Sequence, residues 1–404
     1  MSLAGKKILI AVTGGIAGYK VCEIIRDLKK SGALVRVMMT PDATHFIAPL
    51  TFETLSENPV LTSLFPETGW GSTVHIEWAR WPDLILICPA TANSIAKIAC
   101  GLADNAVTTT ILASTARKVF CPAMNKEMYA NPSYQSNQSR LMEWGFQMVA
   151  PGVGSLACGE EGWGRLANKE EILYQIQSVL TEEKDLTDYK ILITAGPTEE
   201  PLDPVRFISN HSSGKMGYAI AERAELRGAS ITLVSGPSGL QTRGAVRVIK
   251  VVTAQEMFDA VKEHLPESNI FISAAAVSDY RPAAFSPTKI KKSAQDSNLR
   301  LLKNPDILEW AATQKQDLIL VGFSVETERE IENSIEKLRH KKLDLIVVNN
   351  PLEPGAGFQT DTNRVTVIDD QGRCDEWPIM TKIEVADRLL TRVKLLRQTR
   401  SLAS

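Results

Sequence analysis

The sequence lacks the long apolar runs by which membrane proteins are identified. Its longest apolar stretches, such as residues 84–90, are much shorter than the ~18 consecutive apolar residues of a membrane span, and they suit buried strands instead. The chain opens with basic residues and an apolar run at 8–12, which is too short for a signal peptide. We therefore expect no association with a membrane.

Paired cysteines and an excess of charge are also missing. The six cysteines include no C-x-x-C pair, which argues against a zinc site and against a disulfide framework. The expected location is therefore the reducing cytoplasm. Because 45 basic residues nearly balance 47 acidic ones, the chain has no electrostatic footprint for nucleic acid, and we expect no nucleic-acid partner.

What the sequence does contain is the opening of a parallel α/β domain, twice. Residues 7–10 form an apolar run that leads into a glycine-rich turn, and residues 190–193 repeat this opening near the middle of the chain. At 404 residues the chain is also longer than one hydrophobic core usually organises. Further apolar runs alternate with helix-length segments, as is typical of buried parallel strands, at 34–39, 84–88, 118–121, 231–234, 269–274, 318–322 and 344–348.

This pattern predicts an α/β protein with two doubly wound, Rossmann-like domains. We place the first domain at residues 1–180 and the second at 190–404, with a polar linker at 181–189. Residues 364–368 and the polar turn that follows them predict an antiparallel hairpin appended to the second domain.

A glycine-rich turn, Gly14-Gly15-Ile16, stands where the first strand meets the first helix. Glycines at this point let a phosphate approach backbone N–H groups at a helix N-terminus. The motif alone suits a tight structural turn equally well, because the full G-x-G-x-x-G spacing is missing. The same absence counts against an NAD-dependent dehydrogenase, the function that analogy of fold alone would suggest.

Small and hydroxyl-bearing residues follow the apolar run at 84–88. Pro89, Thr91, Asn93 and Ser94 stand at its carboxyl end, where open α/β sheets bind their ligands. Taken singly, Thr91 and Asn93 are each better explained as a helix N-cap.

Three further residues add chemistry to the first half. His75 precedes the strand that begins near residue 84, although a lone histidine is more often a surface or satisfied core residue. Asn125 follows the run at 118–121 in a Pro-x-Met-Asn-x-x-Met motif, and Cys158 lies in a glycine-dense loop. Such a loop is either a disordered connector or a mobile lid, and its central cysteine and terminal Arg165 favour the lid. We expect His75 and Asn125 to converge on one substrate.

Together these motifs resemble the flavoprotein family of homo-oligomeric cysteine decarboxylases. The shared features are the Gly-Gly-Ile-Ala turn, the Pro-Ala-Thr-Ala-Asn segment, a histidine before Ile, the asparagine motif and an Ala-Cys-Gly flap. The family's asparagine motif ends in Trp where this chain has Tyr129, a change that keeps an aromatic ring. The resemblance implies that FMN is bound by Gly14, Gly15, Ile16, Thr40, Pro89, Thr91, Asn93 and Ser94.

The family's chemistry explains why a flavin is needed. Direct loss of CO2 from a cysteinyl amide would leave a carbanion without an electron sink, so the flavin first oxidises the thiol carbon towards a thioaldehyde. Decarboxylation then gives an enethiolate. By resemblance, His75 acts as the base, Asn125 orients the carboxylate or amide, and Cys158 donates a proton when the reduced flavin returns its hydride.

The second half carries a different set of motifs. The segment at 209–217 contains Gly214-Lys215 but lacks the G-x-x-x-x-G-K-[ST] spacing, which argues against a Walker NTPase. Asp279 ends the segment after the run at 269–274, and a basic run at 289–292 follows. A basic run is usually a solvated face. However, an acid that holds Mg²⁺ near lysines that neutralise phosphates is what nucleotidyl transfer requires.

This half resembles bacterial phosphopantothenate-cysteine ligase, and the two resemblances follow the order of the bifunctional enzymes of coenzyme A biosynthesis. The resemblance implies that Lys289 stabilises formation of an acyl-cytidylate, which gives the carboxylate a leaving group, that Asn210 helps to convert it, and that Asp279 holds Mg²⁺. The implied CTP site comprises Ser273, Ala274, Ala275, Asp279, Lys289, Pro305, Asp306, Ile307, Leu308, Phe323, Lys337 and Lys341.

The resemblances also imply substrates and an assembly. The substrates are 4′-phosphopantothenate, cysteine and CTP, and the assembly is a homo-oligomer built on trimers of the first domain, commonly a dodecamer, with paired ligase domains. A peptide-cysteine decarboxylase or a flavin prenyltransferase would share the first domain but would not use the second. A non-catalytic binding protein of the same fold would have little reason to keep His75, Asn125 and Cys158 together.

Overall fold

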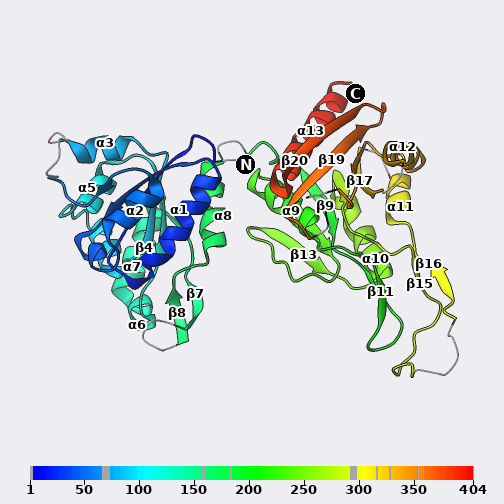
Figure 1. Ribbon diagram of the computed structural model, residues 1–404, viewed down its shortest axis with the longest axis horizontal. Coiled ribbons are helices and arrows are strands. Elements are labelled where there is room, and N and C mark those ends of the chain that lie inside the picture. The colour runs from blue at the N-terminus through cyan, green and yellow to red at the C-terminus, as the bar shows by residue number, and fades with distance from the viewer. Residues whose placement is uncertain are drawn as a thin grey trace. The chain divides into compact units, whose positions relative to one another are not determined.

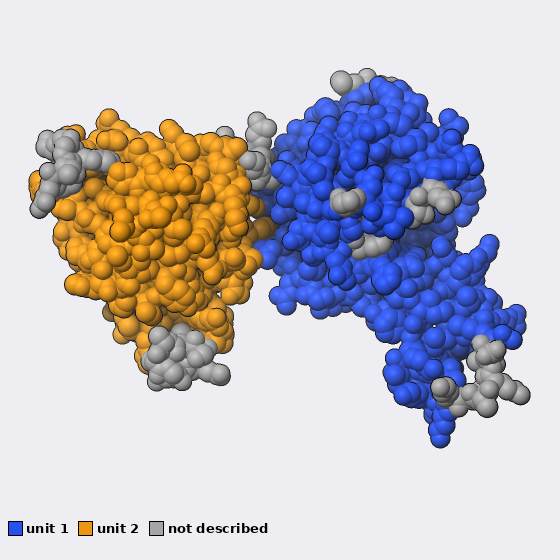
Figure 2. Space-filling view, viewed as in Figure 1, with its two compact units in different colours: residues 1, 183–404 blue, residues 2–182 orange. Residues whose placement is uncertain are grey.

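The computed structural model describes residues 3–65, 73–155, 161–181, 184–291, 298–314, 317–326, 329–353, 355, 357 and 359–403. The chain forms two compact units, residues 2–182 and 183–404 (Figure 2). Each unit is organised around its own, mostly parallel sheet. Within the described residues, no helix is both long enough and apolar enough to cross a membrane.

The first unit contains a six-stranded parallel sheet with the order β3-β2-β1-β4-β5-β6. The order reverses between β1 and β4, so the turns that leave these two strands diverge to opposite faces of the sheet. The strands are β1 (Lys7–Val12), β2 (Leu34–Met39), β3 (Val60–Leu61), β4 (Leu84–Ala90), β5 (Arg117–Pro122) and β6 (Gln147–Met148).

Helices cover both faces of this sheet (Figure 1). In α1 the buried residues Val21, Ile24, Ile25 and Leu28 recur at helical spacing, which explains why this segment packs as a helix on the sheet. The helices are η1 (Ile16–Lys20), α1 (Val21–Lys30), η2 (Pro41–His45), α2 (Pro49–Ser56), α3 (Val74–Arg80), α4 (Ala92–Ala99), α5 (Ala106–Ala113), α6 (Lys126–Ala130), α7 (Pro132–Glu143) and α8 (Lys169–Leu180), and a hairpin joins β7 (Gly152–Ser155) to β8 (Glu161–Arg165).

The second unit contains an eight-stranded sheet with the order β13-β12-β9-β14-β17-β18-β19-β20. The order reverses between β9 and β14, and the last two strands pair antiparallel, as the predicted hairpin requires. The strands are β9 (Lys190–Ala195), β12 (Ser230–Ser235), β13 (Val246–Lys250), β14 (Ile270–Ser273), β17 (Ile319–Val325), β18 (Leu345–Asn349), β19 (Thr362–Asp369) and β20 (Cys374–Thr381). The predicted α/β class with Rossmann-like sheets is therefore confirmed.

Helices and two small hairpins complete the second unit. The hairpins β10 (Glu199–Pro201) with β11 (Phe207–Ser209), and β15 (Tyr280–Pro282) with β16 (Leu301–Lys303), extend away from the main sheet as an arm (Figure 1). The helices are α9 (Lys215–Leu226), α10 (Ala254–His264), η3 (Leu265–Glu267), α11 (Ile307–Thr313), α12 (Glu330–His340) and α13 (Lys382–Ala403).

The start of the second unit is tied to its core. Leu186 is buried among the side chains of that core. Asp185 accepts a hydrogen bond at 2.9 Å from Nε of Arg227, at the end of α9, and forms an ion pair at 2.8 Å with Lys394 of α13. These contacts hold residues 185–186 against the helical layer of the second unit.

Candidate functional site

Thr13 joins the turn after β1 to the turn after β4. Its side chain is completely buried. Its Oγ1 donates to the carbonyl oxygen of Pro89 at 2.7 Å and accepts the backbone N–H of Thr91 at 3.0 Å. The hydroxyl therefore fixes the distance between the two turns at the point where the strand order reverses.

Position 14, in the turn that follows Thr13, requires glycine, because a Cβ there would collide with the side chain of Asp42. At Gly15 a Cβ would make only an ordinary contact, 3.4 Å from Cγ2 of Thr91. Thr40 is buried just before Asp42 and caps η2 by accepting the N–H of Ala43 at 3.3 Å. The absence of side chains at 14 and 15 keeps the start of η1, at Ile16, accessible beside these hydroxyl groups.

The segment after β4 begins α4. Thr91 is the N-cap of this helix, since its Oγ1 accepts the N–H of Ser94 at 3.4 Å, and it also donates to the buried Ser94 Oγ at 3.2 Å. The capping role thus holds for Thr91, whereas Asn93 lies inside the helix and is exposed. The N-terminus of α4 therefore opens beside the Gly14 turn, and a helix N-terminus favours an anion.

Asn125 stands at the N-terminus of α6, next to the β7–β8 hairpin. Its Oδ1 accepts the N–H of Glu127 at 2.7 Å. The N–H of Met124 donates to the carbonyl oxygen of Gly164 at 3.0 Å, and Gly164 has a positive φ of 121°. A Cβ at this position would collide with the carbonyl oxygen of Met124. The hairpin strand β8 is therefore docked beside Asn125, while Cys158, between the two strands, lies outside the described residues.

His75 lies in the first turn of α3 and is half-buried. Helix α3 packs against α5. In Figure 1, α3 and α6 lie at opposite ends of the first unit. The structure therefore does not bring His75 and Asn125 together within one copy of the chain, although we expected them to converge.

In the second unit, Thr198 joins the turns after β9 and β14. Its side chain is completely buried. Its N–H donates to the carbonyl oxygen of Ala276 at 3.3 Å, and its Oγ1 accepts the N–H of Ser278 at 3.0 Å. The side chain of Asn210 donates to the carbonyl oxygen of Val277 at 3.0 Å. The segment from Ser273, Ala274 and Ala275 to Asp279 is thus held where this strand order also reverses.

Two lysines at the end of α12, Lys337 within the helix and Lys341 directly after it, reach neighbouring elements. Lys337 Nζ donates to the carbonyl oxygen of Phe323 at 3.2 Å, at the end of β17. Lys341 Nζ pairs with Asp306 at 2.6 Å, and Asp306 caps α11 by accepting the N–H of Glu309 at 2.9 Å. The first turn of that helix contains Ile307 and Leu308, both buried, and Pro305 precedes the cap. The contacts bring the ends of β17, α11 and α12 together.

The charges of these groups are set by their surroundings. Burial, reinforced by the charge of Lys341, lowers the pKa of Lys337. Burial acts to raise the pKa of Asp306, but the hydrogen bond from Lys341 and the N–H of Glu309 outweigh it, so that the pKa is lowered. The buried surroundings thus act against the charge of Lys337, while the Asp306 carboxylate is kept ionised beside Lys341.

Asp279 and Lys289 are both exposed. The carbonyl oxygen of Asp279 accepts the N–H of Asn304 at 2.8 Å, and the Asn304 side chain donates to the carbonyl oxygen of Ser278 at 2.8 Å. Among the described residues, no group of three or more His, Cys, Asp or Glu side chains is placed to hold a metal ion.

The motifs alone did not single out several residues that organise these sites. Thr13 directly follows the apolar strand β1, and Thr198 lies three residues after β9, so the available signal was a hydroxyl residue just after a buried apolar strand. Asn304 contacts Ser278, and Asp203 and Arg206 both contact the backbone of Ile290. These contacts join segments distant in sequence, which no local pattern predicts.

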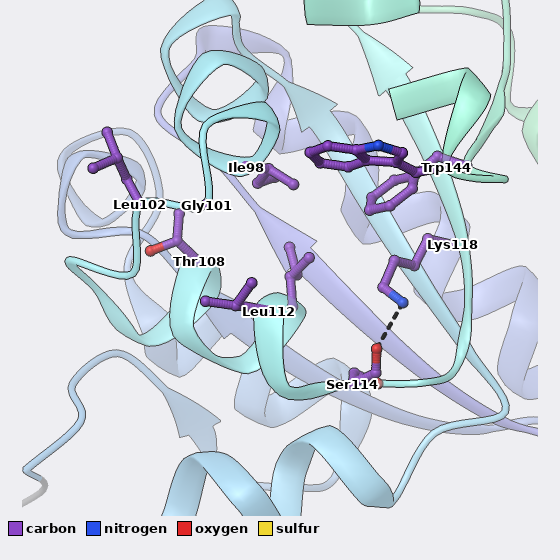
Figure 3. Close-up of a pocket in the computed structure, with 10 residues that line it drawn as sticks. Ile98, Gly101, Leu102, Thr108, Leu112, Ser114, Lys118 and Trp144 are labelled. Atoms are coloured by element: carbon purple, nitrogen blue, oxygen red, sulfur yellow. Dashed lines mark hydrogen bonds between the residues drawn. The ribbon is translucent and has the colours of Figure 1, made fainter. Parts of the chain in front are cut away.

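A separate pocket of about 160 Å³ lies near the ends of α4 and α5 and contains none of the predicted site residues. Figure 3 shows apolar side chains and Trp144 around it, with Lys118 Nζ donating to the carbonyl oxygen of Ser114 at 2.8 Å. Burial lowers the pKa of Lys118. The lining residues are Ile98, Gly101, Leu102, Thr108, Ile111, Leu112, Ser114, Lys118, Trp144 and Phe146.

Comparison with known proteins gives matches over both units. Residues 1–181 match the family described as "Flavoprotein", and residues 186–396 match "DNA/pantothenate metabolism flavoprotein C-terminal domain". Among solved structures, the C-terminal domain of a coenzyme A biosynthesis bifunctional protein CoaBC is 38% identical, with a TM-score of 0.46 over 53% of this chain and 98% of that one. The FMN-binding protein AtHal3 is 30% identical, with a TM-score of 0.40 over 44% of this chain and 98% of that one.

Curated relatives cover nearly the whole chain. The coenzyme A biosynthesis bifunctional protein CoaBC of Vibrio vulnificus (strain YJ016) is 42% identical over 98% of this chain and 99% of its own length. Those of Escherichia coli (strain K12) and Bacillus subtilis (strain 168) are 45% and 43% identical, over 90% and 98% of this chain and of their own lengths. Since the family models span both units and these relatives align almost end to end, the chain belongs to the family of coenzyme A biosynthesis bifunctional proteins CoaBC.

Proposed function

We propose that the chain catalyses two successive steps of coenzyme A biosynthesis. The second unit ligates 4′-phosphopantothenate to cysteine through an acyl-cytidylate, converting CTP to CMP and pyrophosphate, and the first unit decarboxylates the product with FMN to 4′-phosphopantetheine. One observation carries the proposal. In each unit, the turns that contain the predicted motif are hydrogen-bonded together at the point where the strand order of that unit's sheet reverses. Membership of the bifunctional family supports both activities.

The residues around the Gly14 turn fit FMN. The missing Cβ atoms at 14 and 15, the N-terminus of α4 and the buried hydroxyls of Thr40 and Ser94 form a polar, sterically open cradle for a phosphate. When bound there, FMN supplies a reversible two-electron acceptor beside the substrate thiol.

The chain's own residues then orient the substrate and move protons. We assign Asn125 to holding the substrate carboxylate or amide, His75 to removing a proton, and Cys158 to returning one. Because α3 and α6 lie at opposite ends of the unit, we assign His75 and Asn125 of one active site to different copies of the chain. This arrangement supports a homo-oligomer assembled through the first unit. The dodecameric order, the paired ligase units and a cytoplasmic location remain predictions.

In the ligase unit, Lys337 and Lys341 provide positive charge for the nucleotide, and Asp306 orients Lys341. Lys289 would neutralise phosphate charge during activation of the carboxylate. Asn210, which is hydrogen-bonded to Val277 in the loop after β14, would contact the acyl group. Asp279 has no cluster of acidic neighbours among the described residues, so we assign Mg²⁺ to Asp279 together with the phosphates of CTP.

A titration of the purified protein with FMN tests the first half of the proposal. We expect a yellow, stoichiometric complex, and decarboxylation of added 4′-phosphopantothenoylcysteine that does not require NAD(P)H. His75→Asn should abolish this reaction while FMN binding and assembly persist. Loss of FMN binding in that variant would show that His75 is structural rather than catalytic.

A further inference from the structure

Asp203 organises the loop between β10 and β11. Its side chain is fully buried. Its Oδ1 accepts the backbone N–H groups of Val205 and Arg206, both at 2.9 Å. Its Oδ2 accepts Nε and Nη2 of Arg206 at 3.0 and 2.6 Å. One carboxylate therefore shapes the loop and also orients the guanidinium of Arg206, in a charge-assisted arrangement that is stronger than neutral hydrogen bonds.

The same two side chains hold a residue 87 positions further along the chain. The N–H of Ile290 donates to Asp203 Oδ2 at 3.1 Å, and the carbonyl oxygen of Ile290 accepts Nη2 of Arg206 at 2.7 Å. A third contact joins the segments, because the N–H of Ser286 donates to the carbonyl oxygen of Leu202 at 3.0 Å. Both backbone polar groups of Ile290 are thus fixed to the β10–β11 loop.

Stabilisation of a turn does not account for the whole arrangement. An aspartate that only shapes its own turn needs the N–H groups two and three residues on, which Oδ1 already accepts. The hydrogen bonds to Ile290 are not needed for that turn, and Ile290 directly follows Lys289. The side chain of Lys289 is exposed, and a free lysine has high rotamer entropy, so where its ammonium group can reach depends on where its backbone is held.

We propose that Asp203 is a positioning residue for Lys289: with Arg206 it clamps Ile290, and thereby presents the lysine to the phosphates of CTP during carboxylate activation. The inference rests on the proposed ligase function and on the role assigned there to Lys289. Arg206 keeps the pKa of the Asp203 carboxyl well below its usual range, so the clamp remains charged at every pH near neutrality.

The test replaces Asp203 by Asn, which preserves shape but removes the charge and turns part of an acceptor into a donor. Pyrophosphate release from CTP and 4′-phosphopantothenate, without cysteine, is measured in a single turnover. We expect a rate ~10–100-fold lower, the size that misplacing a catalytic group by about 1 Å can produce. Decarboxylation of supplied 4′-phosphopantothenoylcysteine should be unchanged. Asp370→Asn, the same change in an exposed turn between β19 and β20, is the matched control and should keep the parent rate.

A double-mutant cycle with Lys289→Gln separates positioning from general loop stability. If Asp203 acts through Lys289, the double variant is no slower than Lys289→Gln alone, whereas independent contributions multiply. The inference is overturned if the rate losses of the two single variants multiply in the double variant. It is also overturned if Asp203→Asn keeps the parental rate while Lys289→Gln is slow. A parental rate in Lys289→Gln instead overturns the role that the proposed function gives to this lysine. If Asp203→Asn does not fold, Arg206→Gln, which releases the carbonyl of Ile290, takes its place in the same cycle.

Discussion

Replacing Thr13 by Val removes one hydroxyl and almost nothing else. In the structure this hydroxyl donates to the carbonyl oxygen of Pro89 at 2.7 Å in a buried hydrogen bond, and accepts the N–H of Thr91 at 3.0 Å in a partly buried one. Each bond contributes ~1 kcal/mol net, and leaving the carbonyl oxygen of Pro89 buried without a partner adds a desolvation penalty. We expect the free energy of unfolding of the first unit to fall by ~2–4 kcal/mol and FMN binding to weaken at least ~10-fold, since ~1.4 kcal/mol corresponds to tenfold in an equilibrium constant.

Thr110→Val is the matched control for this change. Thr110 is also completely buried, but among the described residues its Oγ1 has no hydrogen-bond partner. Replacing it should leave stability unchanged or slightly improved. Urea unfolding followed by tryptophan fluorescence suits the comparison, because five of the seven tryptophans, at 70, 78, 81, 144 and 163, belong to the first half. Equal losses in the two variants would refute the idea that Thr13 ties the two turns together.

Three further changes test other contacts. The pKa of Asp185 is lowered to about 2, chiefly by hydrogen bonds from Arg227, a shift worth ~2 kcal/mol that solvent screening reduces to ~1 kcal/mol. Because this folded-state pKa is depressed, the stabilisation exists above about pH 4 and is lost as the pH falls through 2. Asp185→Asn should therefore lower the unfolding free energy of the second unit at pH 7 but not at pH 2, and an equal loss at both would exclude an ionic origin. Gly164→Ala should push β8 away from Met124 and slow decarboxylation, whereas Gly152→Ala, whose Cβ would make only an ordinary contact at 4.0 Å with the carbonyl oxygen of Arg165, should not; identical rates would mean that docking of the hairpin is irrelevant. In Asn210→Asp, the new carboxylate cannot donate a hydrogen bond to the carbonyl oxygen of Val277, so acyl-cytidylate should accumulate before cysteine attacks it. Mass spectrometry that detects no acyl-cytidylate in this variant would contradict the prediction.

The sheets followed from the sequence because their strands are short, continuously apolar and fully buried. Strand β4 is buried along its whole length, so its pattern is unambiguous. The edge strand β13 (Val246–Lys250) contains only half-buried and exposed residues, and β6 contains only two residues, so neither stands out from its neighbours. The predicted hairpin could be recognised because a polar turn separates β19 from β20.

The candidate sites were only partly predictable. Residues at the carboxyl end of a strand, such as Thr91 directly after β4 and Ser273 as the last residue of β14, could be placed because the carboxyl ends of parallel strands share one edge of the sheet. The position of His75 could not be predicted in this way, since His75 lies inside a seven-residue helix, Val74–Arg80, and does not directly precede a strand. The clamp of Asp203 on Ile290 joins residues 87 positions apart through backbone atoms, and side-chain patterns carry no record of such a contact.

One coupled assay tests most directly whether both activities belong to this chain. The purified protein is incubated with FMN, CTP, Mg²⁺, cysteine and 4′-phosphopantothenate, and all species are followed by mass spectrometry. Our account predicts transient 4′-phosphopantothenoylcysteine and then 4′-phosphopantetheine, with one CMP, one pyrophosphate and one CO2 for each product molecule. Lys289→Gln should stop the sequence before the first product yet still decarboxylate 4′-phosphopantothenoylcysteine that is supplied. Failure of the parent protein to form either product, or loss of both steps in that variant, would contradict two separate sites.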